Sequence, residues 1–239
     1  MKVLVLGASG ATGRLVANQL FRKGIPSRLV ARENSLIPEE ILNNKNVEIV
    51  RGNITEFDNY IHTNLISDCD AIVCCLGHNL TFKGIFGKPR KLVYEAIKNI
   101  CYAINKNGNH KYKIILMNTT GNLRKDETKN ISLGEKIILA ILKILLPPHS
   151  DNISASNYLL NEIGDNPKIE WVIVRPDTLI NQEQETKYEV YESPTRSPLF
   201  NPGKTSRINV SHFIAELLTD DELWQKWNNK MPVLYNTEE

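Results

Sequence analysis

Short apolar runs alternate with amphipathic segments along most of this chain. The run Val-Leu-Val-Leu at residues 3–6 has no polar position, which is typical of a parallel strand buried on both faces of a sheet. Further strands are predicted at residues 27–31, 47–50, 71–76, 114–117 and 170–174, and helices at about residues 12–23, 38–43, 92–106, 137–146 and 153–163. This alternation predicts an α/β fold, a Rossmann-like doubly wound parallel sheet with a small C-terminal lid region.

The pattern is weaker in the last quarter of the chain. Residues 188–191 predict a short strand, and the Pro-, Ser- and Gly-rich segment 193–204 predicts a loop. Residues 207–210 predict another strand, which leads into a helix that begins at Ser211, a favourable N-cap.

Three glycines follow the first strand in the sequence Gly-Ala-Ser-Gly-Ala-Thr-Gly. Strand, glycine turn and helix in this order is the context that a dinucleotide-binding loop requires, although a tight turn without a ligand is the alternative. The first glycine permits the turn, the second lets the backbone approach a pyrophosphate, and the third lets the helix pack on the strand. Free N–H groups and the helix dipole favour the phosphate charge. The residues predicted to bind the cofactor here are Gly7, Ala8, Ser9, Gly10, Ala11, Thr12 and Gly13.

The end of the second predicted strand bears on the choice of cofactor. An acidic residue at this position would accept hydrogen bonds from the ribose of NAD, whereas an arginine accommodates the 2′-phosphate of NADP. This chain has Arg32 there, and Arg14 at the helix start adds positive charge. Glu33 dilutes the preference, and a solvent-exposed arginine without a ligand is the alternative. We predict that NADP(H) is preferred, with NAD(H) as the second cofactor.

Two later motifs lie at other strand ends. The fifth predicted strand runs into Asn-Thr-Thr-Gly at residues 118–121, and the sixth is Trp-Val-Ile-Val-Arg-Pro at residues 171–176. Together with the glycine turn and Val-Ala-Arg at residues 30–32, they resemble the atypical and extended short-chain dehydrogenase/reductase superfamily. The resemblance is to its NmrA-like and flavin/biliverdin-reductase-like members, and it extends from residue 1 to about residue 180.

The resemblance implies further contacts with the cofactor. Relatives carry an Asp that contacts the adenine where this chain has Asn53, and an amide retains both a donor and an acceptor for that role. The residues implied to line the cofactor beyond the glycine turn are Asn53, Ile54, Cys75, Leu76, Gly77, Thr119 and Pro176.

Three side chains are candidates for catalysis. Thr120 stands where the superfamily places its active-site Ser or Thr, although a Thr that forms a turn is the alternative. Tyr158 lies on the expected helix, but position 162 is Glu and no lysine occurs between Lys143 and Lys168, so the usual Tyr-x-x-x-Lys pair is missing from this helix. His78 follows the fourth strand and is an acid/base candidate or an ordinary loop residue.

The resemblance and the missing pair together lead to two hypotheses. The first is an NAD(P)H-dependent oxidoreductase that transfers a hydride to a small electron-poor acceptor, such as a flavin, a quinone or a conjugated carbonyl, without a Tyr–Lys pair. The alternative is a non-catalytic, NADP(H)-binding redox sensor of the NmrA-like type. An isomerase or epimerase ranks last, because that chemistry normally uses the Tyr–Lys pair.

Length and charge limit the remaining functions. The 239 residues predict a single domain over 1–239, in which 181–239 contribute the lid and the C-terminal helices. The net charge of +2 gives no electrostatic case for nucleic acid or an anionic membrane, so a small-molecule substrate is expected. The chain begins directly with its first strand, which leaves no room for a signal peptide and predicts a cytoplasmic protein.

Cysteines and the longest apolar segment complete the prediction. The four cysteines, at positions 69, 74, 75 and 101, lack metal or disulfide spacing and are predicted to be buried free thiols, with no metal site. Residues 137–146 are too short to span a membrane and predict a buried or half-buried helix. The alternative for this helix is an interfacial or dimer contact, and the protein is expected to be a monomer or a homodimer.

Overall fold

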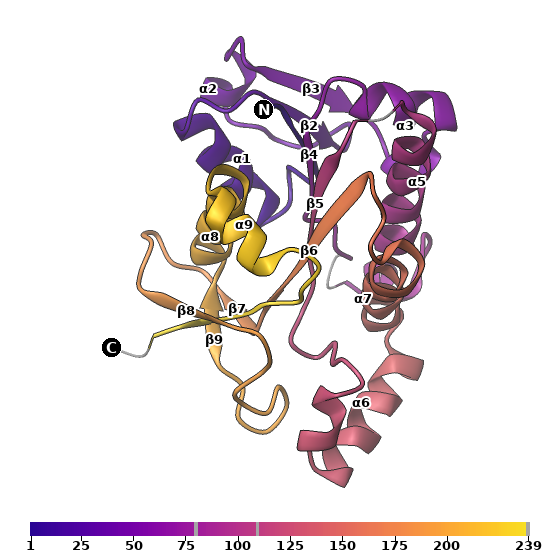
Figure 1. Ribbon diagram of the computed structural model, residues 1–239, viewed down its shortest axis with the longest axis vertical. Helices are drawn as coiled ribbons and strands as arrows, with labels where there is room; N and C mark the ends of the chain where they lie inside the picture. The colour runs from indigo at the N-terminus through magenta and orange to yellow at the C-terminus, as the bar shows by residue number, and fades with distance from the viewer. Residues whose placement is uncertain (79–80, 109, 238–239) are drawn as a thin grey trace.

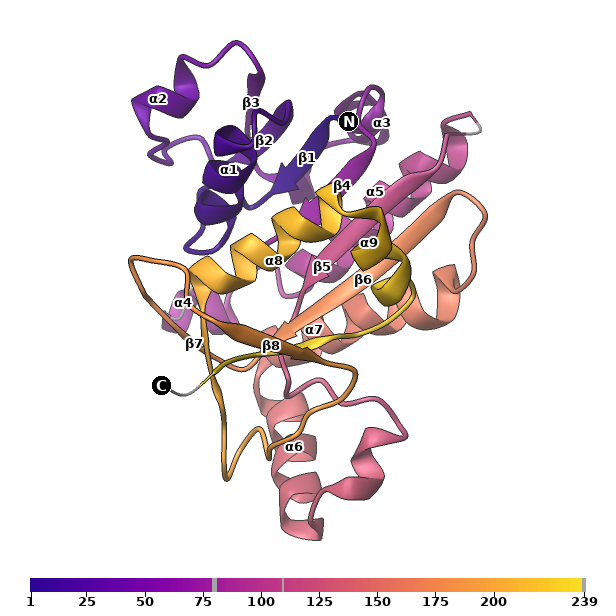
Figure 2. The same ribbon diagram turned by 60° about the vertical axis from the view of Figure 1, so that its left-hand side comes forward.

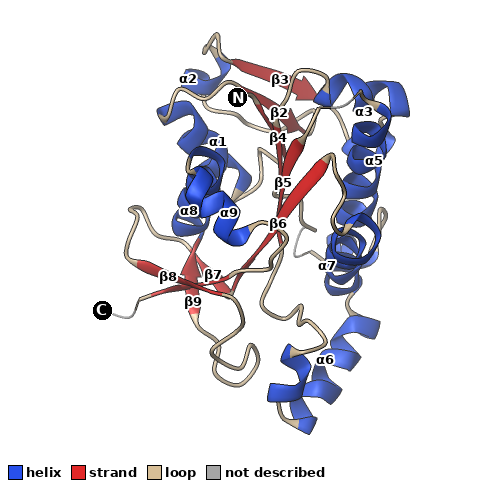
Figure 3. Ribbon diagram, viewed as in Figure 1, coloured by secondary structure: helices blue, strands red, loops and turns tan. Residues whose placement is uncertain are grey.

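The computed structural model describes residues 1–78, 81–108 and 110–237, and its centre is one eight-stranded sheet (Figures 1 and 3). The strand order is β3-β2-β1-β4-β5-β6-β10-β8, and each neighbouring pair is parallel except β10 with β8. The strands are β1 (Val3–Leu6), β2 (Ser27–Ala31), β3 (Val47–Arg51), β4 (Ala71–Cys74), β5 (Tyr112–Met117), β6 (Ile169–Pro176), β8 (Tyr188–Tyr191) and β10 (Val233–Asn236). The predicted doubly wound α/β fold is therefore confirmed.

Helices cover both faces of this sheet (Figure 1). One face carries α1 (Gly13–Arg22), α8 (Arg207–Thr219) and α9 (Asp221–Trp227); the other carries α3 (Asn59–Ile66), α5 (Leu92–Lys106) and α7 (Pro147–Asn157). Alternate residues of each strand supply the two cores, as the period of a strand requires. Val3 and Val5 pack in the core with α1 and α8, whereas Leu4 and Leu6 pack in the core with α5.

The shorter elements lie in the connections between these layers. β7 (Thr178–Ile180) and β9 (Lys204–Ser206) form a separate two-stranded parallel sheet. The remaining elements are α2 (Glu39–Leu42), α4 (Phe82–Phe86), α6 (Leu133–Leu145), the 3₁₀ turns η1 (Ile54–Glu56) and η2 (Glu127–Asn130), and the π-helical turn η3 (Tyr158–Ile163) that continues α7. No helix of the described residues is long and apolar enough to cross a membrane.

The C-terminal prediction needs one correction. The segment predicted as a strand at residues 207–210 is the first turn of α8, and the strand lies just before it, at Lys204–Ser206. Ser206, not Ser211, caps the helix, because its hydroxyl accepts a hydrogen bond from the Asn209 N–H at 3.2 Å. The side chain of Asn209 is buried and bonds to Asn236 and Thr186, contacts that the local pattern does not contain.

The prediction for the apolar segment 137–146 is also wrong. This segment belongs to α6, which projects from the body of the molecule (Figures 1 and 2). It is neither buried nor half-buried along most of its length, since Ile144 is 81% and Leu145 is 60% exposed. The spacing of apolar residues along a helix predicts which side of the helix is apolar. It does not show whether other segments of the same chain bury that side.

The four cysteines are free and buried, as predicted. Burial raises the pKa of Cys69 to about 11 and that of Cys74 to about 12. These thiols are therefore protonated at neutral pH and pack as small apolar groups.

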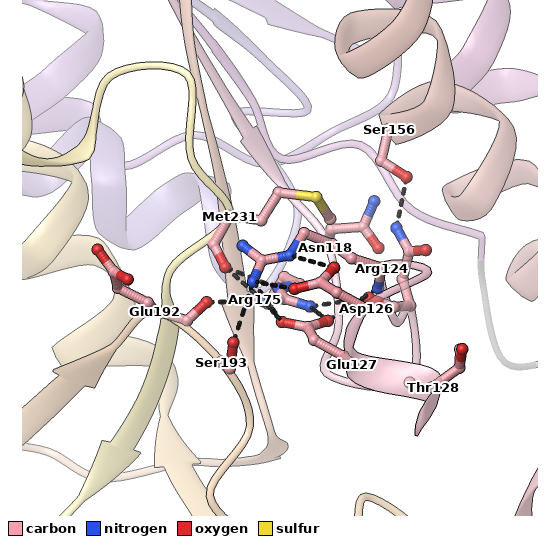
Figure 4. Close-up of polar contacts among 12 residues, drawn as sticks. Asn118, Arg124, Asp126, Glu127, Thr128, Ser156, Arg175, Glu192, Ser193 and Met231 are labelled. Atoms are coloured by element: carbon pink, nitrogen blue, oxygen red, sulfur yellow. Dashed lines mark hydrogen bonds and ion pairs between the residues drawn. The ribbon is translucent and has the colours of Figure 1, made fainter. Parts of the chain in front are cut away.

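A buried ion pair attaches the segment around η2 to the sheet (Figure 4). The Arg175 side chain at the end of β6 is fully buried and donates to both carboxylate oxygens of Glu127, each at 2.7 Å. It also donates to the carbonyl oxygens of Asn122 and Met231. Burial alone would raise the pKa of Glu127, but the bonds and charge of Arg175 outweigh this and lower that pKa below its usual 4.5.

We predict that Glu127→Gln destabilises the protein by about 3–5 kcal/mol, because it leaves the Arg175 guanidinium charged and buried without its counter-ion. The measurement is the free energy of unfolding in urea at pH 7. Since folding lowers the pKa of Glu127, its stabilisation is complete above pH 4.5 and is lost as the pH falls below it. The difference between wild type and variant should therefore shrink in acid. Asp126→Asn is the control: its carboxylate pairs with Arg124 at the surface, and we expect a change below about 1 kcal/mol.

Candidate cofactor and active site

The glycine turn is packed so tightly that two positions exclude any side chain. Gly7 has a φ of +78°, and a Cβ built on it would lie 2.9 Å from the Cys75 carbonyl oxygen. A Cβ on Gly13 would lie 2.1 Å from the Gly7 carbonyl oxygen. The glycine turn therefore packs against the backbone that follows β4. The start of α1 packs in turn against the backbone of the glycine turn. This geometry also places the backbone of Cys75 and Leu76 beside the glycine turn.

The turn presents free hydrogen-bond donors at the start of a ten-residue helix. The Gly10 N–H donates to Gly7 O at 2.9 Å, and the Ala8 N–H donates to Val30 O at 3.3 Å. Among the described residues, none accepts a hydrogen bond from the N–H groups of Ser9 or Ala11. Free N–H groups at a helix N-terminus suit a phosphate, so these residues fit the pyrophosphate of a dinucleotide.

Arginines gather at the outer end of this site. Arg32 is exposed directly after β2, and Arg14 lines a pocket of ≈ 280 Å³ together with Ala8. Arg51, at the end of β3, donates to the carbonyl oxygens of Glu33 at 2.8 Å and Ser35 at 3.1 Å, so it shapes the turn that carries Arg32. The sequence prediction missed Arg51, although its place at a strand end was visible.

Asn53 and Ile54, the two residues expected to contact the adenine, also make contacts that stabilise the fold. The Asn53 side chain accepts from the Thr55 N–H at 3.3 Å and donates to Glu56 at 2.9 Å, which caps the turn η1. Ile54 is 3% exposed and lies in the core with α5. Contact of these residues with the adenine stays a prediction.

Thr120 follows β5 and bonds to the last residue of β6. Its side chain is buried, its N–H donates to Pro176 O at 3.2 Å, and its hydroxyl faces the Asp177 carboxyl. Asp177 in turn accepts from the N–H of Gly203 at 3.0 Å, in the loop predicted as the lid. Burial raises the pKa of Asp177. The neighbouring Thr119 is only half-buried, so this arrangement favours Thr119 over Thr120 for contact with a ligand.

His78 has a partner that the sequence prediction missed (Asp151). The His78 Nε2 lies 2.8 Å from Asp151 Oδ2, and the Asp151 side chain is completely buried. Asp151 also accepts from the N–H groups of Val93 at 2.8 Å and Tyr94 at 3.0 Å, so it caps α5 from the first turns of α7. Nothing in the local sequence around Asp151 points to this pair, because the two residues are 73 positions apart.

A second histidine lies at the same edge of the sheet. His149 is half-buried at the start of α7, and a Cβ built on Gly121 would lie 3.4 Å from its Cε1 atom. Burial lowers the pKa of His149, and the charge of Lys143 lowers it further. Its imidazole is therefore neutral at pH 7 and lies beside the turn that carries Thr119.

Tyr158 does not lie together with His78, Asp151 and His149. It lies two turns further along the α7 helix than Asp151, and its ring meets the ring of Tyr94 edge to face at 5.9 Å. Burial raises the pKa of Tyr158 to about 12, and no lysine stands at position 162 to lower it. Its assignment as catalytic stays a prediction.

Comparison with known proteins identifies the family. The model of the NAD(P)H-binding family matches residues 7–221, and the chain belongs to this family. This match confirms the predicted NAD(P)-binding class, and the resemblance to NmrA-like members stays a prediction. A chloroplastic protein of Arabidopsis thaliana is 27% identical over 114 residues, which are 48% of this chain and 40% of the relative. The chain thus matches less than half of that relative's length.

Solved structures share the fold at low sequence identity. The oxidoreductase ylbE of Lactococcus lactis is 19% identical with a TM-score of 0.70, over 100% of this chain and 92% of that chain. ChuY, an anaerobilin reductase of Escherichia coli O157:H7, is 16% identical with a TM-score of 0.69, over 100% and 98%. A short-chain dehydrogenase/reductase of Veillonella parvula in complex with NADP is 14% identical with a TM-score of 0.68, over 98% and 94%.

We predict that Gly13→Ala weakens NADPH binding at least tenfold and destabilises the protein by about 1–3 kcal/mol, because the new Cβ forces the turn away from α1. Fluorescence titration with NADPH and thermal unfolding measure the two effects. Gly134→Ala is the matched control, since a Cβ on Gly134 meets nothing within 4 Å. Unchanged NADPH affinity in Gly13→Ala would show that the turn does not hold the cofactor.

Proposed function

We propose that this protein is an NAD(P)H-dependent oxidoreductase that reduces a small electron-poor acceptor, such as a flavin, a quinone or a conjugated carbonyl. The observation that carries the proposal is the juxtaposition of a glycine turn that fits a pyrophosphate with the His78–Asp151 pair at the carboxyl ends of the parallel strands. Ligands of open α/β sheets bind at this edge. The names of two similar structures support it: ChuY is an anaerobilin reductase, and a protein of Streptococcus pneumoniae is a putative NADH-flavin reductase.

The residues of this chain divide the work in the proposed site. When bound, the reduced nicotinamide supplies a hydride, and the protein supplies position and a proton. The glycine turn holds the pyrophosphate, and Thr119 and the backbone of residues 75–77 line the nicotinamide end. Asp151 holds the His78 ring through Nε2, which leaves Nδ1 as the nitrogen that exchanges a proton with the acceptor. A histidine held by a buried carboxylate can take over the acid role of the missing Tyr–Lys pair.

We also propose a preference for NADP(H), which rests on Arg14, Arg32 and Arg51. The 2′-phosphate is the group that distinguishes NADP from NAD, and guanidinium groups bind phosphate in a bidentate manner. Arg51 holds the turn that carries Arg32 and adds a third guanidinium to this rim.

We expect Arg32→Glu to weaken NADPH binding by about tenfold to a hundredfold, because one charge-assisted hydrogen bond contributes roughly 1.5–3 kcal/mol. NADH binding should change by less than about threefold, since NADH lacks the 2′-phosphate. The measurement is titration of both reduced cofactors. Arg22→Glu, at the opposite end of α1, is the control and should bind both as the wild type does. An equal loss of both cofactors would contradict the role of Arg32.

We expect His78→Gln to lower kcat by about 10²–10⁴-fold with little change in NADPH affinity, because it removes a proton donor and not a binding group. Asp151→Asn should lower kcat less, since it keeps the shape but loses the charge that orients the ring. The assay follows NADPH oxidation with flavin and quinone acceptors. The control is His110→Gln, whose histidine pairs with Asp70 at 3.3 Å on the surface. An unchanged kcat in His78→Gln would exclude His78 as the acid.

A non-catalytic redox sensor is the second candidate function. One observation favours it: the Thr120 hydroxyl faces a buried carboxyl and Tyr158 packs on α5, so both side chains serve the fold. The experiment that separates the two functions is NADPH binding compared with NADPH consumption. Tight binding without oxidation by any acceptor would favour the sensor, and consumption above the protein-free rate would favour the reductase.

A further inference from the structure

Helix α6 projects from the body of the molecule (Figures 1 and 2), and among the described residues its large apolar side chains are exposed. Six of its large apolar side chains are between 38% and 81% exposed, which is unusual for one thirteen-residue helix: Leu133, Ile137, Ile138, Ile141, Ile144 and Leu145. At 100° per residue these six positions share one side of the helix. We call this surface the α6 face.

The exposed charged side chains of α6 are positive, and its one acidic side chain is buried. The exposed charged residues of α6 are Lys136 and Lys143, which are seven positions apart and therefore lie along one border of the face. Glu135, the helix's acidic residue, is buried on the inner side and accepts a hydrogen bond from the Ser197 hydroxyl at 2.5 Å. The two acids just before the helix are also engaged, Asp126 with Arg124 and Glu127 with Arg175.

We propose that the α6 face docks on an anionic lipid surface, with the helix lying in the plane of the interface. An apolar face bordered by lysines fits this environment, because the apolar side chains enter the acyl boundary while the lysines meet anionic headgroups. A second copy of the chain fits less well, since a two-fold pairing of this face would bring lysines together without an exposed acid on either helix. The net charge of +2 does not show this, because it averages over the whole surface.

The position of α6 suits such docking. The helix projects from the sheet, so a flat surface can reach it without contacting the central strands (Figure 2). At 1.5 Å per residue its length is about 20 Å, enough to lie on a bilayer and too short to cross one. The bond from Ser197 to Glu135 joins α6 to the loop 193–204, in which Phe200 is 64% exposed. This inference does not depend on the proposed reductase activity.

The test is sedimentation of the full chain with vesicles of phosphatidylcholine alone and of phosphatidylcholine with phosphatidylglycerol. We expect binding to the anionic vesicles that weakens with salt. The variant Ile137→Glu/Ile144→Glu should weaken it at least tenfold. Lys136→Glu/Lys143→Glu should weaken it by about twentyfold or more, at roughly 1 kcal/mol for each lysine removed. Tyr60→Glu is the matched control: Tyr60 is 73% exposed on α3, outside α6, and should leave binding unchanged.

Two further measurements, one of folding and one of oligomeric state, distinguish lipid docking from other causes of a lost vesicle interaction. Each variant should bind NADPH as the wild type does, which shows that a lost vesicle interaction is not a lost fold. Sedimentation velocity without lipid tests the second copy. A dimer that Ile137→Glu/Ile144→Glu dissociates would overturn the proposal in favour of self-association. Failure of the wild type to bind anionic vesicles, or equal binding to both vesicle types, would also overturn it.

Discussion

The buried guanidinium of Arg175 is the interaction on which the layer at the carboxyl ends of the strands depends. A fully buried charge is stable only when its donors find acceptors, and here Glu127 and the carbonyl oxygens of Asn122 and Met231 provide them. Asn122 and Glu127 lie in the segment before α6, and Met231 lies just before β10. One side chain therefore ties the segment before α6 to the paired strands β6 and β10. Arg124 extends the connection, because it donates to Ser193 at 3.0 Å.

The glycine turn and the His78–Asp151 pair are held in place by different interactions. The glycine turn is set by steric exclusion, since Gly7 and Gly13 pack against backbone atoms with no space for a Cβ. The His78–Asp151 pair is set by burial and hydrogen bonds, since Asp151 holds both His78 and the start of α5. The glycine turn thus depends on close-packed backbone, whereas the His78–Asp151 pair depends on one polar side chain held inside the fold. The first turns of α7 carry Asp151, and in the proposed function the His78–Asp151 pair takes the acid role of the missing Tyr–Lys pair.

Charge acts locally in this protein. The whole chain is nearly neutral at +2, yet arginines gather beside the glycine turn and lysines border the α6 face. Around the α6 face the acids nearby are bound to other partners or lie inside the fold. Surface charges further apart than about 8–10 Å interact weakly in salt, so a ligand senses its own neighbourhood and not the total.

The sequence by itself determined seven of the eight strands of the main sheet, most helices, the glycine turn and the class of cofactor, whereas β10 was not predicted. These features depend on neighbouring residues, through the period of apolar positions and the steric freedom of glycine. Only the tertiary structure decided which polar side chains meet. His78 and Asp151 are 73 positions apart, and Arg175 and Glu127 are 48 apart, so no local pattern marks either pair. It also decided that α6 is uncovered and that α8 begins at Arg207, because cover and capping depend on how distant segments pack.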